Sequence, residues 1–279
     1  MKRWLLYFFS VFIVLYVSPM VTAELDVTNE IPIITVFADG TVGEMDVEEY
    51  TYRVLLREGA MLTEQEARKA LAVAIRSEAI YLSIYGCKHA DFDVCTDREC
   101  CIELGREEDF EPTYIENTKN AVEQTFGLGM AEGRDVAMAL FSQCSGGSTG
   151  NCENFGYLVG VKSESRCEIH KAERVFSASI FETLKDACLV YDGFGKCSFG
   201  VFGGEYYSRE ELLEELMLPS ADFALEVVDD EIRAVVYGIG HGFGLCVCGS
   251  EKMAKTGENF ESILQYYYPN LNINKFYFN

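Results

Sequence analysis

A chain of 279 residues, 49% of them hydrophobic, is long enough to bury one large core or two modest ones. It carries 45 acidic residues against 23 basic ones, a formal net charge of −22. This charge argues against a nucleic-acid-binding protein and against binding to anionic lipid, because both rely on basic patches. The acidic residues are spread along the chain, which is typical of a solvated surface.

The first 23 residues have the pattern of an export signal. Residues 1–3 supply positive charge, residues 4–17 are predominantly apolar, and Val21-Thr22-Ala23 places small residues where a signal peptidase cleaves. The apolar stretch is short for a spanning helix, although counting through Val21 brings it near the lower limit of about 17 residues. We expect a cleaved signal peptide over residues 1–23, or an uncleaved N-terminal anchor as the alternative. In both cases the globular part is exported.

Strands and helices alternate irregularly after the signal. Residues 33–37 predict a strand that ends in a turn at Asp39-Gly40. A long helix is expected from a capping box at Thr63-Glu-Gln-Glu66 to about Tyr85, because small and apolar residues recur there at helical spacing. Further expected elements are a helix over 113–126, a hairpin turn at 132–135, a capped helix from Ser208 to about Met217, and a helix over 260–268 stopped by Pro269. Without regular βαβ alternation, this mixture predicts an α+β fold, with one domain over residues 24–279.

Eleven cysteines in an exported chain call for an explanation, and an odd number excludes complete intramolecular pairing. Cys87, His89, Cys95, Cys100 and Cys101 lie close together in one predicted loop. Cysteine and histidine at such short spacing could hold a zinc ion, although the spacing fits no standard zinc finger. A local disulfide is the alternative.

Residues 238–244 read Gly-Ile-Gly-His-Gly-Phe-Gly and follow residues 232–237, which look like a strand. If the run continues that strand, its four glycines share one bare face and His241 points from the other. A bare face is expected where the backbone comes close to a ligand or to a second chain segment. The alternative is a glycine-rich bulge with an incidental histidine.

Several segments, taken in order, resemble the stage II sporulation protein D family of bacterial cell-wall lytic enzymes and amidase enhancers. They span residues 33–272, nearly the whole exported part. The matching segments are residues 47–58, the alanine-rich helix at 69–76, the loop at 92–100, Phe141-Ser-Gln-Cys-Ser-Gly-Gly-Ser148, Gly240-His-Gly-Phe-Gly244 and Ile263-Leu-Gln-Tyr-Tyr-Tyr-Pro269.

The resemblance implies a peptidoglycan lytic transglycosylase that cleaves MurNAc-GlcNAc glycan strands lacking stem peptides, in sporulation and engulfment or in ordinary wall turnover. Glu58 corresponds to the catalytic glutamate and lies 18 residues before Arg76, which is also the family's spacing. One carboxyl group suffices: it protonates the leaving oxygen and then accepts the proton of the sugar's own 6-hydroxyl as a 1,6-anhydro ring closes. Partial burial beside Val54 and Leu55 would raise its pKa for this purpose.

The resemblance also implies the remaining site residues, partners and location. Its cleft residues are Arg76, Ser145, Gly146, Gly147, Gly240, His241 and Gly242. It favours a structural zinc ion bound by His89, Cys95 and either Cys100 or Cys101, with water as the fourth ligand. The implied partners are peptidoglycan strands and a cell-wall amidase or other membrane proteins of division or engulfment. The implied location is outside the cell or at the outer face of the bacterial cytoplasmic membrane.

The chain departs from the family pattern at three places. Leu71 replaces a glutamine, Glu78 replaces a tyrosine, and residues 245–248 replace Met-Ser-Gln-Tyr. Loss of polar groups that bond a sugar weakens discrimination by several kcal/mol. A catalytically weak or inactive glycan-binding relative that activates an amidase is therefore an alternative, and a cysteine-rich redox or metal-storage protein is a third.

Overall fold

The computed structural model describes residues 30–86, 89–97, 100–163, 170–177, 188–228 and 231–278. The expected signal or anchor over residues 1–23 lies outside these ranges, as does Cys87. Within the described ranges, no helix is both long enough and apolar enough to cross a membrane. The described part is a mixture of helices and mainly antiparallel strands, which confirms the predicted α+β class.

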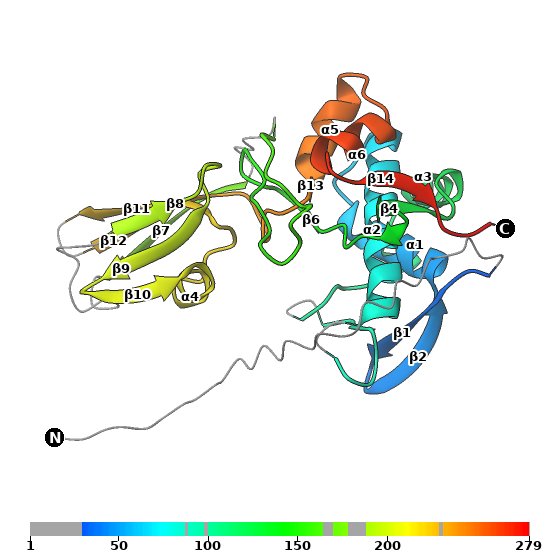
Figure 1. Cartoon of the computed structure of the whole chain (residues 1–279), viewed down its shortest axis with the longest axis horizontal. Helices are drawn as coiled ribbons and strands as arrows, with labels where there is room; N and C mark the ends of the chain where they lie inside the picture. Colours follow the sequence, from blue (N-terminus) through cyan, green and yellow to red (C-terminus); the bar gives the residue numbers. More distant parts are fainter. Residues whose placement is uncertain are drawn as a thin grey trace.

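A helical lobe is built around one long central helix, α2 (Gln65–Tyr85), which Figure 1 shows in cyan. The helices packed against it are α1 (Val47–Glu58), α3 (Pro112–Gln124), α5 (Val247–Lys255) and α6 (Phe260–Tyr267). The first half of α2 is rich in alanine, and Ala67, Ala70 and Ala74 are fully buried. Small side chains let neighbouring helices approach closely, so α2 is the core of this lobe.

Two small sheets flank these helices. In the first, the order is β2-β1-β3, formed by β1 (Ile33–Ala38), β2 (Thr41–Asp46) and β3 (Val94–Cys95). In the second, the order is β14-β4-β5, formed by β4 (Leu128–Glu132), β5 (Asp135–Val136) and β14 (Asn272–Lys275). A 3-10 turn, Glu107–Asp109, precedes α3. The strand over 33–37, its Asp39-Gly40 turn and the hairpin at 132–135 are therefore confirmed.

A second lobe, on the left in Figure 1, has its own hydrophobic core. Its sheets have the orders β11-β12-β7 and β10-β9-β8. The strands are β7 (Lys171–Ser177), β8 (Cys188–Tyr191), β9 (Cys197–Phe202), β10 (Glu205–Ser208), β11 (Asp222–Val228) and β12 (Glu231–Tyr237). One helix, α4 (Arg209–Glu215), begins at the predicted capping box, where Ser208 and Glu211 bond reciprocally. The predicted single domain thus contains two lobes.

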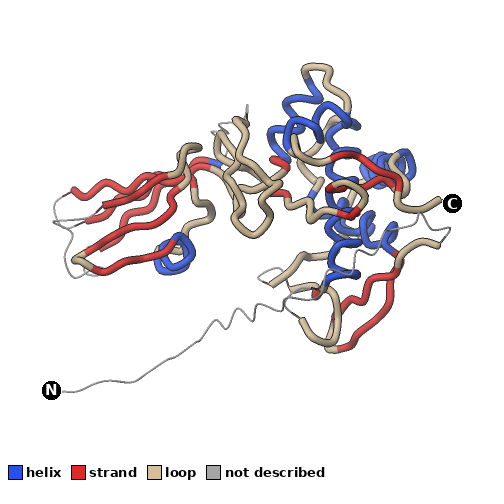
Figure 2. Tube along the Cα trace, in the orientation of Figure 1, coloured by secondary structure: helices blue, strands red, loops and turns tan. Residues whose placement is uncertain are grey.

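The two lobes meet at loops that Figure 2 draws in tan around the short parallel pair β6 (Phe141–Ser142) and β13 (Leu245–Cys246). Here the glycine run 238–244 crosses the segment 140–146. Gly238, with φ +89°, would place a Cβ atom 2.4 Å from the carbonyl oxygen of Cys144, and Gly244, with φ +64°, would place one 1.9 Å from that of Leu140. The expectation that the run continues strand β12 is wrong, because its glycines adopt the left-handed region. The expected close approach of a second chain segment is confirmed.

One local prediction is corrected. The helix α2 begins at Gln65, and the hydroxyl of Thr63 bonds to Glu251 instead of capping the helix. Residues 247–248, one of the departures from the family pattern, belong to α5, whose N-cap is Cys246.

Candidate active site

A cavity of about 540 Å³ lies between the two helices α1 and α2 and the junction of the lobes. We call it the Glu58 cavity. Its lining includes Glu58 from the end of α1, Glu78 from α2, Gln143 after β6, and His241 from the glycine run. A second cavity of about 320 Å³ is also lined by Glu58 and Gln143. Folding therefore brings Glu58 and His241, which are far apart in the sequence, to one hollow, and the size suits part of a sugar chain.

Glu58 is the last residue of α1, and its carboxyl group is held by Gln143. The side-chain Nε2 of Gln143 donates hydrogen bonds to Glu58 Oε2 at 2.6 Å and to the Glu58 backbone carbonyl at 2.8 Å. Gly59 ends the helix, and its N–H donates to the carbonyl of Leu55 at 2.9 Å. Glu58 is half-buried beside fully buried Val54. The carboxyl group thus points from a rigid helix end into an apolar-walled cavity.

Glu78 is a second carboxyl group in the same cavity. Desolvation by burial, together with the negative charge of Glu58, raises the pKa of Glu78 to about 7. Near neutral pH a substantial fraction of Glu78 is therefore protonated. Sequence reasoning recorded Glu78 only as a departure from the family. The sequence did contain a sign that Glu78 belongs to the site: it lies between Ile75 and Leu82 on one face of α2, and an acidic residue is unusual on an apolar face. All three residues line the cavity.

Hydrogen bonds with Ser142 and the backbone of Phe243 orient the ring of His241. Its Nδ1 accepts a hydrogen bond from the backbone N–H of Phe243 at 3.0 Å and lies 3.2 Å from the hydroxyl of Ser142. That hydroxyl in turn accepts from the N–H of Gly242 at 2.8 Å, so its own proton is available to Nδ1. The remaining proton of the neutral ring is assigned to Nε2.

The imidazole of His241 stays neutral at physiological pH. Part of the residue is exposed, but neighbouring atoms crowd the ring, and this desolvation lowers the pKa of His241 to about 4. A neutral Nε2–H can donate a hydrogen bond to a sugar oxygen and carries no charge that would pair with Glu58.

Arg76 does not lie in the Glu58 cavity, which corrects its predicted place in the cleft. Its side chain is fully buried and forms a two-point ion pair with Glu48, with Nη2–Oε2 at 2.7 Å and Nε–Oε1 at 2.9 Å. Its Nη1 also donates to the carbonyl of Leu128 at 3.0 Å. The same carboxylate accepts from Tyr277 Oη at 2.7 Å. Arg76 therefore ties α2 to α1 and to the second sheet, and its contacts are structural.

The glycine and serine residues predicted to line the cleft lie at two separate places. Gly240 lines the Glu58 cavity, whereas Gly242 lies outside its lining; its N–H donates to Ser142 and its carbonyl accepts from the N–H of Gly150. Gly146 and Gly147 line a separate hollow of about 460 Å³ beside Asp222, and Ser145 is fully buried with its carbonyl bonded to the ammonium of Lys196. The predicted cleft role of residues 145–147 is therefore not supported at the Glu58 cavity itself.

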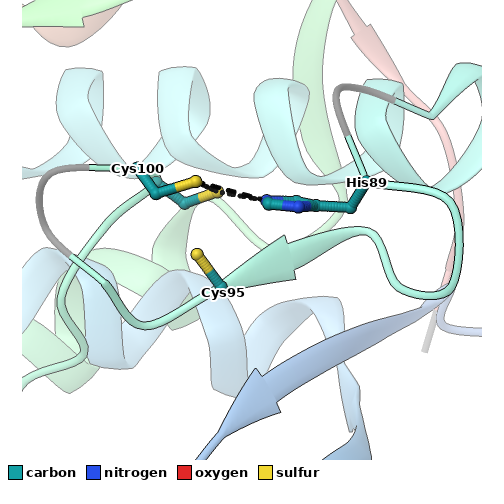
Figure 3. Close-up of side chains that lie close together, drawn as sticks. His89, Cys95 and Cys100 are labelled. Carbon is teal, nitrogen blue, oxygen red and sulfur yellow. Dashed lines mark hydrogen bonds between the residues drawn. The ribbon is translucent and has the colours of Figure 1, made fainter.

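Four thiol and imidazole groups gather beside the cavity. We call His89, Cys95, Cys100 and Cys101 the His89 cluster; their donor atoms all lie within 4.8 Å of one another. Figure 3 shows Cys95, Cys100 and the imidazole of His89 converging on one point. His89 Nε2 is 3.5 Å from Cys100 Sγ and 3.2 Å from Cys101 Sγ, and the two sulfurs are 3.9 Å apart. Tetrahedral Zn²⁺ places neighbouring sulfurs about 3.8 Å apart, and nitrogen and sulfur about 3.6 Å apart.

The surrounding elements fix this cluster in place. Cys95 lies in β3, which pairs with β1, and the carboxylate of Asp93 accepts a bond from the N–H of Thr35 at 2.7 Å. The ring of His89 packs against that of Phe92 with centroids 4.4 Å apart. Cys100 and Cys101 also line the Glu58 cavity. The residues present fit a closed four-ligand metal site, instead of the expected three ligands and a water.

The chain is similar to one known protein family and to several curated proteins. The family model described as SpoIID, Stage II sporulation protein, matches residues 39–131, which include Glu58 and the His89 cluster. The chain is 27% identical over 267 residues to Stage II sporulation protein D of Bacillus subtilis, covering 85% of this chain and 77% of that protein. It is 26% identical over 263 residues to Stage II sporulation protein D of Bacillus amyloliquefaciens, covering 84% and 76%. It is also 27% identical over 254 residues to an uncharacterised protein of Brachyspira hyodysenteriae, covering 83% and 67%.

Proposed function

Because this chain belongs to the SpoIID family of stage II sporulation proteins, we propose that it acts on the bacterial cell wall as a peptidoglycan lytic transglycosylase. The observation that carries this proposal is the position of Glu58, held by Gln143 at the edge of a cavity that His241 also lines. Glu58 borders two hollows, which offer room for glycan on either side of the bond that is cut.

The proposed chemistry needs one carboxyl group that first gives and then takes a proton. Protonated Glu58 donates to the glycosidic oxygen of the leaving sugar while the anomeric carbon gains oxocarbenium character. The resulting carboxylate then accepts the proton of the 6-hydroxyl as that oxygen closes the 1,6-anhydro ring. Gln143 keeps the carboxyl group oriented through both steps, and the neutral imidazole of His241 binds a glycan oxygen.

Glu78 favours a second candidate reaction, hydrolysis of the same bond. Hydrolytic glycosidases use a pair of carboxyl groups, one as acid and one as base or nucleophile. Glu58 and Glu78 line one cavity and interact electrostatically. The two reactions leave different ends: a 1,6-anhydro sugar after transglycosylation and a reducing sugar after hydrolysis.

We also propose that the His89 cluster binds zinc and that this zinc is structural. Four protein ligands fill a tetrahedral site and leave no position for a water molecule. The ion would hold the loop between α2 and α3 against the cavity that Cys100 and Cys101 line. Metal analysis of the purified chain with and without Cys95→Ser tests this: zinc content that is the same in both proteins would reject it.

Export to the outer face of the cytoplasmic membrane, action on glycan strands during sporulation, and cooperation with an amidase are parts of the same proposal. The non-catalytic alternative is a glycan-binding protein that activates such an amidase. Leu71 and the altered residues 245–248, where the family carries polar residues, are all buried and do not line the Glu58 cavity, so they do not favour that alternative through lost glycan contacts.

The deciding experiment incubates purified glycan strands lacking stem peptides with wild type, Glu58→Gln and Glu78→Gln. Glu116→Gln, an exposed glutamate on α3, is the matched control. We expect 1,6-anhydro ends from wild type, Glu78→Gln and the control, and a loss of at least about 100-fold for Glu58→Gln. Reducing ends that require both glutamates would indicate hydrolysis. Binding without products from any variant would support the amidase activator.

A further inference from the structure

A second group of metal-binding side chains lies at the junction of the two lobes. The donor atoms of Cys144, His170 and Cys248 all lie within 4.8 Å of one another. We call them the Cys144 cluster. The three residues come from distant parts of the chain: the segment after β6, the residue before β7, and the first turn of α5. Cys144 is fully buried and Cys248 is 8% exposed, whereas His170 is partly exposed.

The geometry within the Cys144 cluster suits a shared ion. Sγ of Cys248 is 3.6 Å from Nδ1 of His170, which equals the nitrogen–sulfur separation of about 3.6 Å expected around tetrahedral Zn²⁺. On its other side, the same sulfur is 3.8 Å from the thioether sulfur of Met61. Two thiols and an imidazole form a donor set that selects zinc or copper(I) over hard cations such as Mg²⁺.

Cys246, whose side chain hydrogen-bonds with that of Cys144, is not a member of the cluster. Its sulfur accepts the backbone N–H groups of Ser145 and Gly249, both at 3.3 Å, and so caps the start of α5. Other buried cysteines, such as Cys197 in the second lobe and Cys152, belong to neither of the two groups that gather among the described residues. Burial of a cysteine therefore does not by itself explain why three potential metal ligands meet in the Cys144 cluster.

We propose that Cys144, His170 and Cys248 bind a second zinc ion, separate from the His89 cluster. On binding, each thiol releases its proton to solvent and the two thiolates with neutral His170 supply three ligands, leaving a fourth position next to Met61. This inference does not depend on the transglycosylase proposal.

The ion would join the two lobes at the wall of the Glu58 cavity. Cys144 directly follows Gln143, the residue that holds Glu58, and its backbone pairs with that of Ile239 near His241. The carbonyl of His170 accepts the N–H of Gly238 at 3.0 Å, just before β7 enters the second lobe. Cys248 belongs to a helix of the first lobe. A metal bond among the three would fix the second lobe relative to Gln143 and His241.

The test counts zinc in the full chain purified under reducing conditions. We expect two ions per chain in wild type, one in Cys95→Ser and one in Cys248→Ala. The combined Cys95→Ser/Cys248→Ala variant should hold none. Cys197→Ser, a buried cysteine outside both clusters, is the matched control and should keep two. One ion in wild type that Cys248→Ala does not remove overturns the proposal.

A second measurement covers the case in which Cys248→Ala does not fold. In the Cys95→Ser background, His170→Gln changes a partly exposed residue and leaves both buried thiols. We expect titration with Co²⁺ to give thiolate-to-metal charge-transfer absorption with the Cys95→Ser protein, and His170→Gln to weaken Co²⁺ binding at least tenfold. Equal binding by both proteins, or a Cys144–Cys248 disulfide found by peptide mass analysis, contradicts the proposal.

Discussion

Gln143 donates two hydrogen bonds from one nitrogen to Glu58, one to the carboxylate at 2.6 Å and one to the backbone carbonyl at 2.8 Å. Both residues line the Glu58 cavity, and they are 85 positions apart in the chain. A single amide group therefore couples the end of α1 to the segment that leaves β6, and the carboxyl group cannot turn away from the cavity without breaking this link.

Replacing Gln143 with leucine should lower the turnover number and leave the fold intact. A hydrogen bond to a charged group contributes about 1.5–3 kcal/mol, which corresponds to roughly a 10- to 100-fold loss in rate if the bond is needed in the transition state. Rates of release of glycan ends from denuded strands measure the effect. Gln124→Leu, at an exposed position that ends α3, is the control. A Gln143→Leu rate equal to that of the control would show that Gln143 does not orient the acid.

Glu78 should make stability fall as the pH rises from about 4.5 to about 7. Its pKa in the folded chain is raised to about 7, so in this range the folded protein keeps a proton that the unfolded chain has lost. Ionising the buried group costs up to ~3 kcal/mol over the whole window. Urea unfolding at pH 5 and pH 8 should show a smaller decrease for Glu78→Gln than for wild type. Parallel decreases in the two proteins would place the pKa of Glu78 near its ordinary value.

The sequence predicted the framework of the helical lobe because local signals agree there. The alanine-rich spacing gave α2, Pro269 gave the end of α6, and the Ser208 capping box gave the start of α4. The strands of the second lobe were mostly missed. Of its six strands among the described residues, only β12 was predicted, from the mostly apolar run Ile232-Arg-Ala-Val-Val-Tyr237. Strands such as β8 and β10 are only 4 residues long and exposed or half-buried, so their partners in the sheet define them more than their own sequence pattern does.

The candidate site was predictable only where a motif marked it. Glu58 and His241 were found through family motifs, and the His89 cluster through its short spacing. Arg76 was misplaced because spacing along a helix shows which residues share a face but not which partner covers that face; here the partner is Glu48. Gln143 and the Cys144 cluster depend on contacts between residues far apart in the sequence, which no spacing reveals.

Arg76→Met should destabilise the fold and spare the chemistry of the folded fraction. Removing one partner of a buried ion pair costs about 3–5 kcal/mol, because Glu48 would be left largely buried with its charge unpaired. The double variant Glu48→Gln/Arg76→Met should recover part of that loss, since it removes both charges. Urea unfolding of the four proteins of this cycle measures the coupling. If Arg76→Met is as stable as wild type but has a raised KM for its substrate, Arg76 acts in substrate binding and not in stabilising the fold.

Gly244→Ala should destabilise far more than the same change at Gly257. Both glycines have positive φ, +64° and +100°, so both substitutions carry the backbone cost of about 1–3 kcal/mol for an L-residue in that region. At Gly257 nothing lies within 4 Å of the added methyl group, whereas at Gly244 it would lie 1.9 Å from the carbonyl oxygen of Leu140. The difference between Gly244→Ala and Gly257→Ala in the free energy of unfolding, measured with urea, therefore gives the cost of the clash where the two segments cross. Any displacement of the glycine run that relieves this clash would also move His241 relative to Ser142 and Gln143. The activity of the folded Gly244→Ala protein should therefore also fall. If the two alanine variants unfold at the same urea concentration, the glycine run is free to move away from residue 140, and the close crossing is not what requires glycine at position 244.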